Sequence, residues 1–334
     1  MIRESLGGRR RAAIIGAGRI AGSQANVSDS HADPYSHAAA MKKNRVSIVA
    51  VQDTSYSKAV SFIQKWGGEP FSTLADLLKK YPSLDIIVIA SPDRYHASQA
   101  SEVLRAAGAP RLLIIEKPPV VNEREWEQVN RIASSQSKTR VVVNMSRRFD
   151  TRYAEAAAII KSGKLGKIIS VDFTYYGGWL HNGVHAVDVI CHLLNEEIEV
   201  VSVTEGAPAS YSDPCLDVKA VLGIDPKVQI NFNGFDEGYF QCFELEIRFS
   251  GGRIRFENFG RQIIEEIVEE NELGERELGS ARFLKSSKKL TSMDHLYKAS
   301  CDFIDNGDAR VLECASLKAI SMSMKVIFDA IKHR

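Results

Sequence analysis

The feature that most constrains the fold is a glycine-rich turn directly after a short apolar run near the N-terminus. Residues 12–15 predict a buried strand, and Gly16-Ala17-Gly18-Arg19-Ile20-Ala21 follows it in the pattern G-x-G-x-x-G/A. In this context the first glycine allows a tight turn, and the second lets backbone N–H groups approach a pyrophosphate. We therefore expect Gly16, Gly18, Arg19 and Ile20 to contact a dinucleotide where a helix begins. A glycine turn in another kind of α/β protein is the alternative.

The first half of the chain alternates short β-branched runs with helical patterns, which is typical of repeated βαβ units. Further strands are predicted at residues 46–52, 85–90, 111–116 and 140–144, and helices at residues 57–66, 73–80, 95–107 and 123–134. Four of the five strands are near-continuous apolar runs, as expected where helices cover both faces of a sheet. Residues 9–145 are therefore predicted to form a doubly wound parallel sheet of the Rossmann type.

The pattern changes in the second half, which is predicted to be an α+β domain spanning residues 146–334. Helices are expected at residues 151–161, 184–194, 295–306 and 312–332, and strands at residues 167–176, 198–204, 218–222, 228–233, 243–249, 253–257 and 263–268. Mostly alternating strands are typical of a large, open, mainly antiparallel sheet. We expect a second subunit to cover apolar positions on its open face, namely Val218, Val228, Ile230 and Phe232.

Composition excludes several classes of protein. The 334 residues are enough for about two domains, and 43 basic against 42 acidic side chains leave a net charge of +1. Such a balance predicts no nucleic-acid partner. No apolar run approaches the roughly 20 residues that cross a bilayer, so no membrane partner is expected. Five cysteines without a C-x-x-C pair predict neither a metal site nor a disulfide framework, and they favour a cytoplasmic protein.

Asp53 ends the second predicted strand and is the candidate that would distinguish NAD from NADP. A carboxylate at this point accepts hydrogen bonds from the adenosine ribose and repels a 2′-phosphate, which favours NAD. Lys58 lies one helical turn further on, so NADP stays possible. The spacing from Gly18 is 35 residues rather than the usual ~20, and a polar loop at residues 26–35 accounts for the excess. Capping the next helix or closing a turn is the alternative role.

Polar residues follow two later strands of the predicted parallel sheet. Ser91-Pro92-Asp93 and His96 come after one strand, and Glu116-Lys117-Pro118 comes after the next. Ligands of open α/β sheets bind in the crevice at these strand ends. We therefore expect Ser91, Pro92, Asp93, His96, Glu116 and Lys117 to contact the cofactor. A lysine that only reaches solvent is the alternative for Lys117.

A third polar cluster lies in the second domain, between Gly177 and Asp188. His185 and Asp188 are three residues apart and share one face of the predicted helix. A histidine can accept a proton near neutral pH, as the oxidation of an alcohol requires. Half of a metal site and polar groups that cap a helix are the alternatives for this cluster.

In this order, the clusters resemble the Gfo/Idh/MocA family of glucose-fructose oxidoreductases and inositol dehydrogenases. The resemblance covers most of the chain and is most specific where Glu116-Lys117-Pro118 is followed by Gly183-x-His185-x-x-Asp188. It implies a Rossmann domain followed by an α/β domain whose open sheet pairs subunits into homodimers or homotetramers. It also implies an NAD(P)-dependent dehydrogenase or reductase that acts on the CH–OH group of a sugar, a cyclitol or a nucleotide-linked sugar.

By position in the family pattern, Lys117 would hydrogen-bond the reacting hydroxyl and His185 would be the acid/base. Pro118 would shape its turn, often through a cis bond. The family usually has aspartate where this chain has His181, which would share the proton relay, contact substrate or mark a divergent substrate. The residues expected to contact substrate are Lys117, Arg148, Trp179, His181, Asn182, His185 and Asp188.

Two other functions are compatible with the sequence. Redox-assisted cleavage of a glycoside would hold the cofactor tightly and release no net NADH. The second is a dinucleotide-binding sensor without catalysis. The feature that supports it is His181, which stands where the family usually has aspartate.

Overall fold

The computed structural model describes residues 10–22, 34–207, 213–284 and 291–334. It divides the chain into two compact units, one of residues 1–146 with residues 289–319 and the other of residues 147–288 with residues 320–334. Residues 289–319 thus belong to the N-terminal unit, whereas the sequence assigned everything after residue 145 to a second domain.

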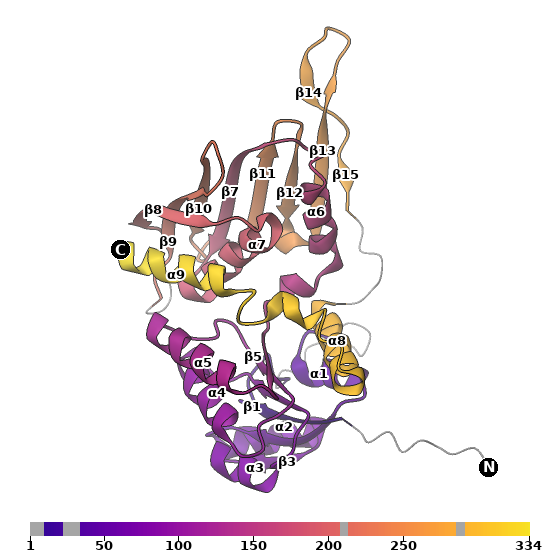
Figure 1. The fold of residues 1–334 in the computed structure, drawn as a ribbon, viewed down its shortest axis with the longest axis vertical. Coiled ribbons are helices and arrows are strands. Elements are labelled where there is room, and N and C mark those ends of the chain that lie inside the picture. The colour runs from indigo at the N-terminus through magenta and orange to yellow at the C-terminus, as the bar shows by residue number, and fades with distance from the viewer. Residues whose placement is uncertain (1–9, 23–33, 208–212, 285–290) are drawn as a thin grey trace, which may run out of the picture. The chain divides into compact units, whose positions relative to one another are not determined.

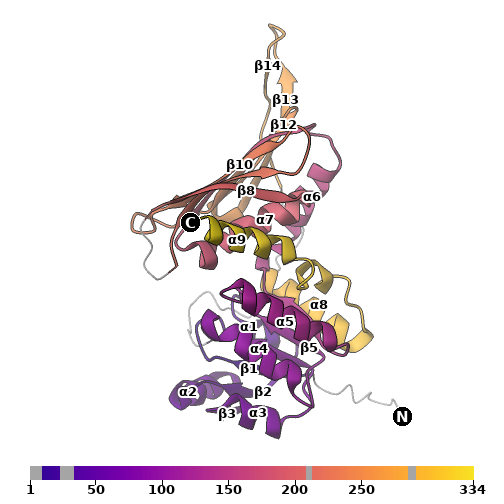
Figure 2. The same ribbon diagram turned by 60° about the vertical axis from the view of Figure 1, so that its left-hand side comes forward.

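The first unit contains a six-stranded sheet in the order β3-β2-β1-β4-β5-β6, in which every pairing is parallel (Figure 1). Helices lie on both faces, and α4 packs beside α5 (Figure 2). The predicted doubly wound sheet is therefore confirmed. Its strands are β1 (Arg11–Ile15), β2 (Ser47–Gln52), β3 (Glu69–Phe71), β4 (Ile86–Ile89), β5 (Leu112–Ile115) and β6 (Arg140–Val143), and its helices are α1 (His37–Lys43), α2 (Tyr56–Trp66), α3 (Leu74–Lys80), α4 (His96–Arg105), α5 (Glu123–Ser135) and α8 (Ser292–Asn306).

The start of the first helix differs from the prediction. Residues 19–22 form a turn, and α1 begins only at His37. The Ser36 side chain sets this start, because its hydroxyl accepts a hydrogen bond from the Ala39 N–H. Most of the predicted polar loop at residues 26–35 lies outside the described residues. The short strand β3 was not predicted, since three residues that include a proline carry no period-two pattern.

Contacts between α1 and α8 explain why residues 289–319 belong to the first unit. The Lys43 Nζ lies 2.5 Å from the Asp294 Oδ2, and the Asp294 side chain is only 3% exposed. The Thr291 hydroxyl donates to the Pro34 carbonyl at 2.8 Å. Arg10, just before β1, pairs with Asp305 at the other end of α8. Polar contacts along the whole helix therefore fix α8 to this unit.

The second unit contains a nine-stranded sheet in the order β14-β13-β12-β11-β7-β10-β9-β8, with β15 paired to β13. Only the β7–β10 pairing is parallel, so the predicted mostly antiparallel sheet is confirmed. Its strands are β7 (Ile168–Tyr176), β8 (Ile198–Glu205), β9 (Leu216–Leu222), β10 (Val228–Phe235), β11 (Glu244–Phe249), β12 (Gly252–Glu257), β13 (Gln262–Glu270), β14 (Arg276–Leu278) and β15 (Arg282–Phe283), and its helices are α6 (Thr151–Lys161), α7 (Val184–Leu194) and α9 (Ser321–His333).

The predicted C-terminal helix is divided in two. Residues 312–315 form a 3₁₀ turn that belongs to the first unit, and α9 starts at Ser321 in the second unit. The chain therefore leaves one unit for the other within the stretch that the sequence predicted as a continuous helix. An apolar pattern of helical spacing does not reveal such a crossing, because both pieces are helical and both bury apolar side chains.

The apolar side chains expected on the open face of the second sheet lie instead on its covered face. Val218, Val228, Ile230 and Phe232 are each at most 6% exposed. The Phe232 ring contacts the Trp179 ring edge-on, at 5.5 Å between centroids, on the face that α7 and α9 cover. The chain's own helices bury these side chains, so they give no argument for a second subunit.

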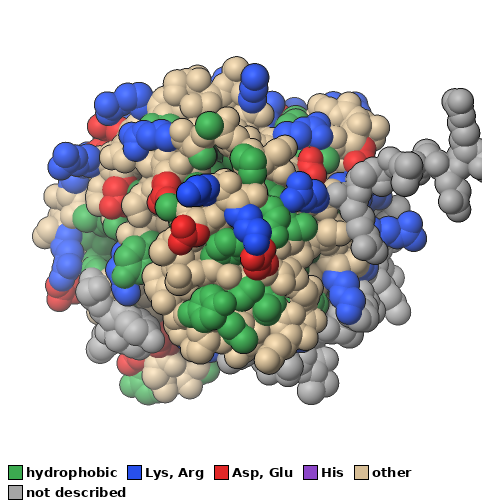
Figure 3. Space-filling model, turned by 90° about the horizontal axis from the view of Figure 1, so that it is seen from below, with side chains coloured by type: hydrophobic (Ala, Val, Ile, Leu, Met, Phe, Trp, Pro, Cys, Tyr) green, Lys and Arg blue, Asp and Glu red, His purple; other side chains and the backbone are tan. Residues whose placement is uncertain are grey.

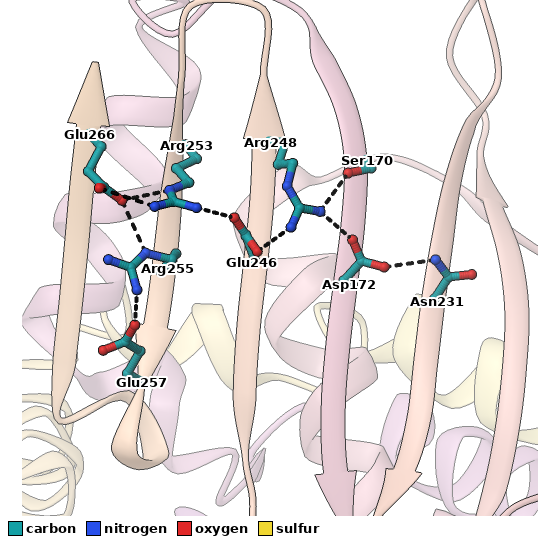
Figure 4. A network of polar contacts seen from close by, with 9 residues as sticks. All are labelled: Ser170, Asp172, Asn231, Glu246, Arg248, Arg253, Arg255, Glu257 and Glu266. Atoms are coloured by element: carbon teal, nitrogen blue, oxygen red, sulfur yellow. Dashed lines mark hydrogen bonds and ion pairs between the residues drawn. The ribbon is translucent and has the colours of Figure 1, made fainter. Parts of the chain in front are cut away.

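The opposite face of this sheet carries a network of charged side chains (Figure 4). Arg253 joins Glu266, at 2.7 Å, to Glu246, at 3.0 Å. Arg248 pairs with Glu246 and with Asp172, and Asp172 accepts a hydrogen bond from Asn231. The hydrogen bond from Arg253 lowers the pKa of the Glu266 carboxyl. These side chains range from buried, for Glu266, to exposed, for Arg248, so the open face is polar and its charges are paired within the chain.

On the lower face of the first unit, basic and acidic side chains are interspersed with apolar ones (Figure 3). In the described parts of the chain, no helix has both the length and the apolar composition needed to cross a membrane.

We predict that Lys43→Met lowers the free energy of unfolding by about 2 kcal/mol, because it leaves the buried Asp294 carboxylate without its cation. The Asp294 Oδ1 already lacks a hydrogen-bond partner within the described residues, so without Lys43 the carboxylate would keep only its favourable place in the first turn of α8. Urea unfolding measures the effect. Lys332→Met is the matched control, because the Lys332 pair with Asp329 is exposed, and it should change stability little. Equal stabilities of the two variants would contradict the prediction.

Candidate functional site

The glycine turn lies at the carboxyl ends of β1 and β4. Gly16 has a φ of +93°, and a Cβ there would lie 2.6 Å from the Ser91 backbone, so only glycine fits. Among the described residues, a Cβ on Gly18 would meet nothing closer than the Ala90 carbonyl oxygen at 3.9 Å. This open space fits the close approach of a pyrophosphate to the turn. Arg19 is exposed and Ile20 is half-buried beside it.

The Asp53 carboxylate touches this glycine turn. Its Oδ2 accepts a hydrogen bond from the Ala17 N–H at 2.9 Å, and its Oδ1 accepts one from the Ser55 N–H at 2.9 Å. Asp53 therefore closes the turn to Ser55, which is the alternative role given above. Its bond to Ala17 also fixes the carboxylate beside the candidate pyrophosphate site. Its half-buried side chain keeps it open to a ribose.

His96, which the sequence predicts to contact the cofactor, lies in the interior of the first unit. It is 1% exposed, and its ring nitrogens lie 2.8 Å from the Ser91 carbonyl oxygen and 2.7 Å from that of Pro118. The histidine therefore ties together the loops after β4 and β5. Pro92 and Asp93 precede and begin a 3₁₀ turn, Asp93–Tyr95, on the accessible side of the first loop. The Lys117–Pro118 bond is cis, as the resemblance implied.

Glu116 lies at the centre of a buried polar cluster in the first unit. Its Oε1 is 2.7 Å from the His37 Nε2 and accepts a hydrogen bond from the Asn144 Nδ2 at 2.6 Å. The His37 Nδ1 lies 2.8 Å from the Tyr297 hydroxyl. Burial raises the pKa of the Glu116 carboxyl, but the hydrogen bond and charge of His37, the Asn144 amide and the Lys117 charge outweigh it, and the pKa is lowered. Lys117 follows directly and is half-buried.

Sequence reasoning did not identify His37, Asn144 or Tyr297 as parts of this cluster. His37 and Tyr297 are 260 positions apart, and none of the three belongs to a motif. One signal was available, namely a histidine on an alanine-rich helix with an otherwise apolar face.

In the second unit, a π-helical turn, Trp179–Gly183, leads directly into α7. The Asp213 carboxylate accepts hydrogen bonds from the Leu180 N–H at 3.0 Å and the His181 N–H at 2.8 Å, which fixes the start of the turn. The His181 side chain is exposed. His185, in the first turn of α7, is half-buried, and its ring meets the Phe243 ring edge-on at 6.4 Å. Turns of this π type are frequent at functional sites.

Three of the predicted substrate contacts serve the interior of the second unit. Arg148 binds Asp188 through two guanidinium nitrogens, and the two side chains are 5% and 3% exposed. Asp188 also accepts a hydrogen bond from the Ser323 hydroxyl. Trp179 is fully buried and donates to the Ile327 carbonyl. The Arg148–Asp188 pair joins residues 40 positions apart, so spacing could not reveal it. Asn182 remains half-exposed beside Gly177.

Arg147, which is not among the predicted site residues, packs against a phenylalanine ring that His185 also contacts. Its guanidinium carbon is 4.0 Å from the centre of the Phe243 ring, which His185 also contacts. The Nε of Arg147 is buried without a hydrogen-bond partner among the described residues. Phe259, in the left-handed region at φ +61°, stacks on Phe243. Strain of this kind in a bulky residue concentrates at functional sites.

Within the described residues, no group of three or more histidine, cysteine, aspartate and glutamate side chains could hold a metal ion. The alternative of a metal half-site at His185 and Asp188 is not supported, because the Asp188 carboxylate forms an ion pair with Arg148.

Residues 10–145 match a family model described as an oxidoreductase family with an NAD-binding Rossmann fold. The scyllo-inositol 2-dehydrogenase (NAD(+)) of Bacillus subtilis is 30% identical over 162 residues, which are 42% of this chain and 42% of that protein. The match thus covers less than half of that relative's length. The matched domain is a nicotinamide dinucleotide-binding domain.

Solved structures share the fold of nearly the whole chain. A 3-ketoreductase from Actinomadura kijaniata, in complex with NADP, has a TM-score of 0.72 at 18% identity, covering 95% of this chain and 96% of that one. The transcriptional regulator Gal80p from Kluyveromyces lactis has a TM-score of 0.72 at 14% identity, covering 97% and 89%. One fold therefore serves both an enzyme and a regulator.

We predict that NAD binds more tightly than NADP, by about tenfold or more, because the Asp53 carboxylate would face the 2′-phosphate. Thr54 and Ser55 follow it, so no arginine is adjacent to bind that phosphate. Calorimetric titration of both cofactors measures the preference. Asp53→Asn should reduce the difference in affinity between NAD and NADP, whereas Asp76→Asn on α3 should leave that difference unchanged. Tighter binding of NADP to the unmodified chain would leave Asp53 with its turn-closing role alone.

Proposed function

We propose that the chain, which belongs through residues 10–145 to the Gfo/Idh/MocA oxidoreductase family, transfers a hydride between a nicotinamide cofactor and a sugar-like substrate. The reacting group would be a secondary alcohol or ketone of a sugar, a cyclitol or a nucleotide-linked sugar. The observation that carries the proposal is the accessible Lys117 next to the anionic Glu116, at the carboxyl end of β5 in an NAD-binding domain. Ligands of such sheets bind at strand ends.

The residues of the first unit fit a dinucleotide. The open space at Gly18 would receive the pyrophosphate, and Asp53 would accept hydrogen bonds from the ribose. When bound, the nicotinamide accepts or supplies the hydride. Ser91, Pro92, Asp93 and Glu116 would contact its nicotinamide half. His96 would act only by holding the two loops in place, since it is buried.

Lys117 and His185 would manage the proton that accompanies the hydride. In the oxidation direction, Lys117 would hydrogen-bond the reacting hydroxyl, and His185 would remove its proton as the hydride leaves the carbon. A half-buried histidine in the first turn of a helix can exchange its proton with solvent afterwards. His181 and Asn182 would contact substrate, and we add Arg147, whose guanidinium lies against the same phenylalanine as His185.

We predict that Lys117→Met and His185→Ala each lower kcat by about 10²- to 10⁴-fold while NAD affinity changes little. Both residues would act at the reacting carbon rather than on the adenosine half of the cofactor. Steady-state kinetics with a panel of inositols, sugars and nucleotide sugars measures turnover, and calorimetry measures NAD binding. His333→Ala, at the exposed end of α9, is the control. Normal turnover in both variants would place the reacting centre elsewhere.

His181→Ala distinguishes the roles left open for that position. If His181 shares the proton relay, kcat should fall and the pH profile should lose one ionisation. If it only contacts substrate, KM should rise with kcat little changed.

Two other outcomes would replace the proposed reaction. Cofactor that stays bound through turnover, without net NADH, would favour redox-assisted glycoside cleavage. Binding of NAD without turnover of any sugar-like substrate would favour a sensor. His181 at the usual aspartate position and the likeness of fold to a transcriptional regulator are the observations that favour the sensor.

We also propose that the chain is a homodimer or homotetramer through the open face of its second sheet. The exposed side chain of Arg248 supports this, because its guanidinium, besides its pairs within the chain, can bind a carboxylate of a second copy. Light scattering at micromolar concentration should give two or four times the chain mass. Arg248→Glu should weaken the association, and Arg310→Glu, at an exposed site, should not. A monomer would refute the proposal.

A further inference from the structure

The cluster around Glu116 contains three side chains that the proposed reaction does not use. His37 comes from α1, Tyr297 from α8 and Asn144 from the end of β6. His37 and Tyr297 are fully buried, and Asn144 is 4% exposed. Three segments that are distant in sequence therefore bring polar side chains to one carboxylate. Burying this many polar atoms is costly unless they are paired, so their arrangement needs a reason.

The hydrogen bonds of the cluster form one connected chain. The His37 Nε2–H donates to the Glu116 carboxylate at 2.7 Å, and the Nδ1 of the same ring lies 2.8 Å from the Tyr297 hydroxyl. The Asn144 amide is the second donor to the carboxylate. Burial raises the pKa of the Tyr297 hydroxyl well above its usual value, so the hydroxyl stays protonated. The bond from Tyr297 to His37 and the bond from His37 to Glu116 together brace the carboxylate.

Both donors bind the same oxygen of Glu116. His37 and Asn144 reach Oε1, whereas Oε2 has no hydrogen-bond partner among the described residues. Glu116 is 7% exposed, and neither of these two hydrogen bonds uses its Oε2. The Glu116 N–H donates to the Ile89 carbonyl, which places the residue beside the end of β4. One carboxylate oxygen is thus held by two donors, and the residue lies at the sheet edge where ligands bind.

We propose that His37 and Tyr297 are positioning residues that hold Glu116 as an anion, with its Oε2 presented to a hydroxyl or amide donor on the nicotinamide half of the cofactor. The inference rests on the proposed function only in taking a nicotinamide dinucleotide as the ligand. Tyr297 reaches the cluster because residues 289–319 belong to the first unit. The far end of the chain therefore takes part in binding the cofactor without touching it.

The test compares NAD affinity at several pH values for the full chain and its variants. His37→Leu removes the donor to Oε1, and burial then raises the pKa of Glu116 above its ordinary value. The groups facing this carboxylate are His37, Asn144 and Lys117, with Tyr297 behind His37. NAD should bind about tenfold more weakly to His37→Leu at pH 6 than to the unmodified chain, and the deficit should shrink as the pH rises and Glu116 ionises. Calorimetry measures each dissociation constant.

Three further variants separate positioning from a structural role. His37→Gln keeps a donor near the position of Nε2 and should restore most of the affinity and remove the pH-dependent deficit. Glu116→Gln in combination with His37→Leu should bind NAD weakly at every pH, because no carboxylate is left to titrate. Tyr297→Phe removes one neutral hydrogen bond and should weaken binding about threefold to tenfold. It also tests the brace if His37→Leu does not fold.

Unchanged NAD affinity in His37→Leu across this pH range would overturn the inference. So would an equal, pH-independent loss in His37→Leu and His37→Gln, which would indicate packing alone. Turnover is measured separately. If the variants show the pH-dependent loss of NAD binding but no variant or unmodified chain turns over substrate, the inference holds and the oxidoreductase function is rejected. If the chain turns over substrate but the variants bind NAD normally, the function holds and the inference is rejected.

Discussion

A parallel sheet covered on both faces leaves only the ends of its strands for chemistry, and this constraint organises the first unit. Apart from the exposed Arg11 at the start of β1, the strands β1, β4 and β5 carry apolar side chains, so the polar groups at the carboxyl edge follow their last residues. Gly16, Ser91 and Glu116 come directly after these strands or one residue later. Because Glu116 is the most buried charge there, the segments that support it, including α1 and α8, are fixed by the need to keep that charge paired.

The sequence predicted the strands and helices that depend on local patterns. The bounds of α6 and α7 match the prediction, and the apolar runs locate the strands of the parallel sheet. The glycine turn was predicted as well, and the family resemblance implied the cis proline. The strands, the helices and the glycine turn follow from periodicity or from residue types whose backbone requirements are specific, and neither depends on distant partners.

The features that the sequence missed depend on pairings between distant residues. Arg148 and Asp188 were predicted to contact substrate, but they neutralise each other inside the second unit. His96 was predicted to contact the cofactor, but it braces two loops. The alternating apolar pattern correctly predicted that Phe232 and its apolar neighbours share one face of their strand. The pattern could not show which face of the sheet the helices cover. In each case the residue type indicated a polar or apolar role, but the sequence did not show which distant residue would be its partner.

The return of residues 289–319 to the first unit has a consequence for how the chain folds during synthesis. A hydrogen bond between positions 260 apart closes only after nearly the whole polypeptide has been made, and contacts of such long range form slowly. Until then α8 is absent from the first unit, and the surface of α1 that α8 later covers is exposed. The nascent first unit is therefore the part of the molecule most in need of protection from aggregation, although it leaves the ribosome first.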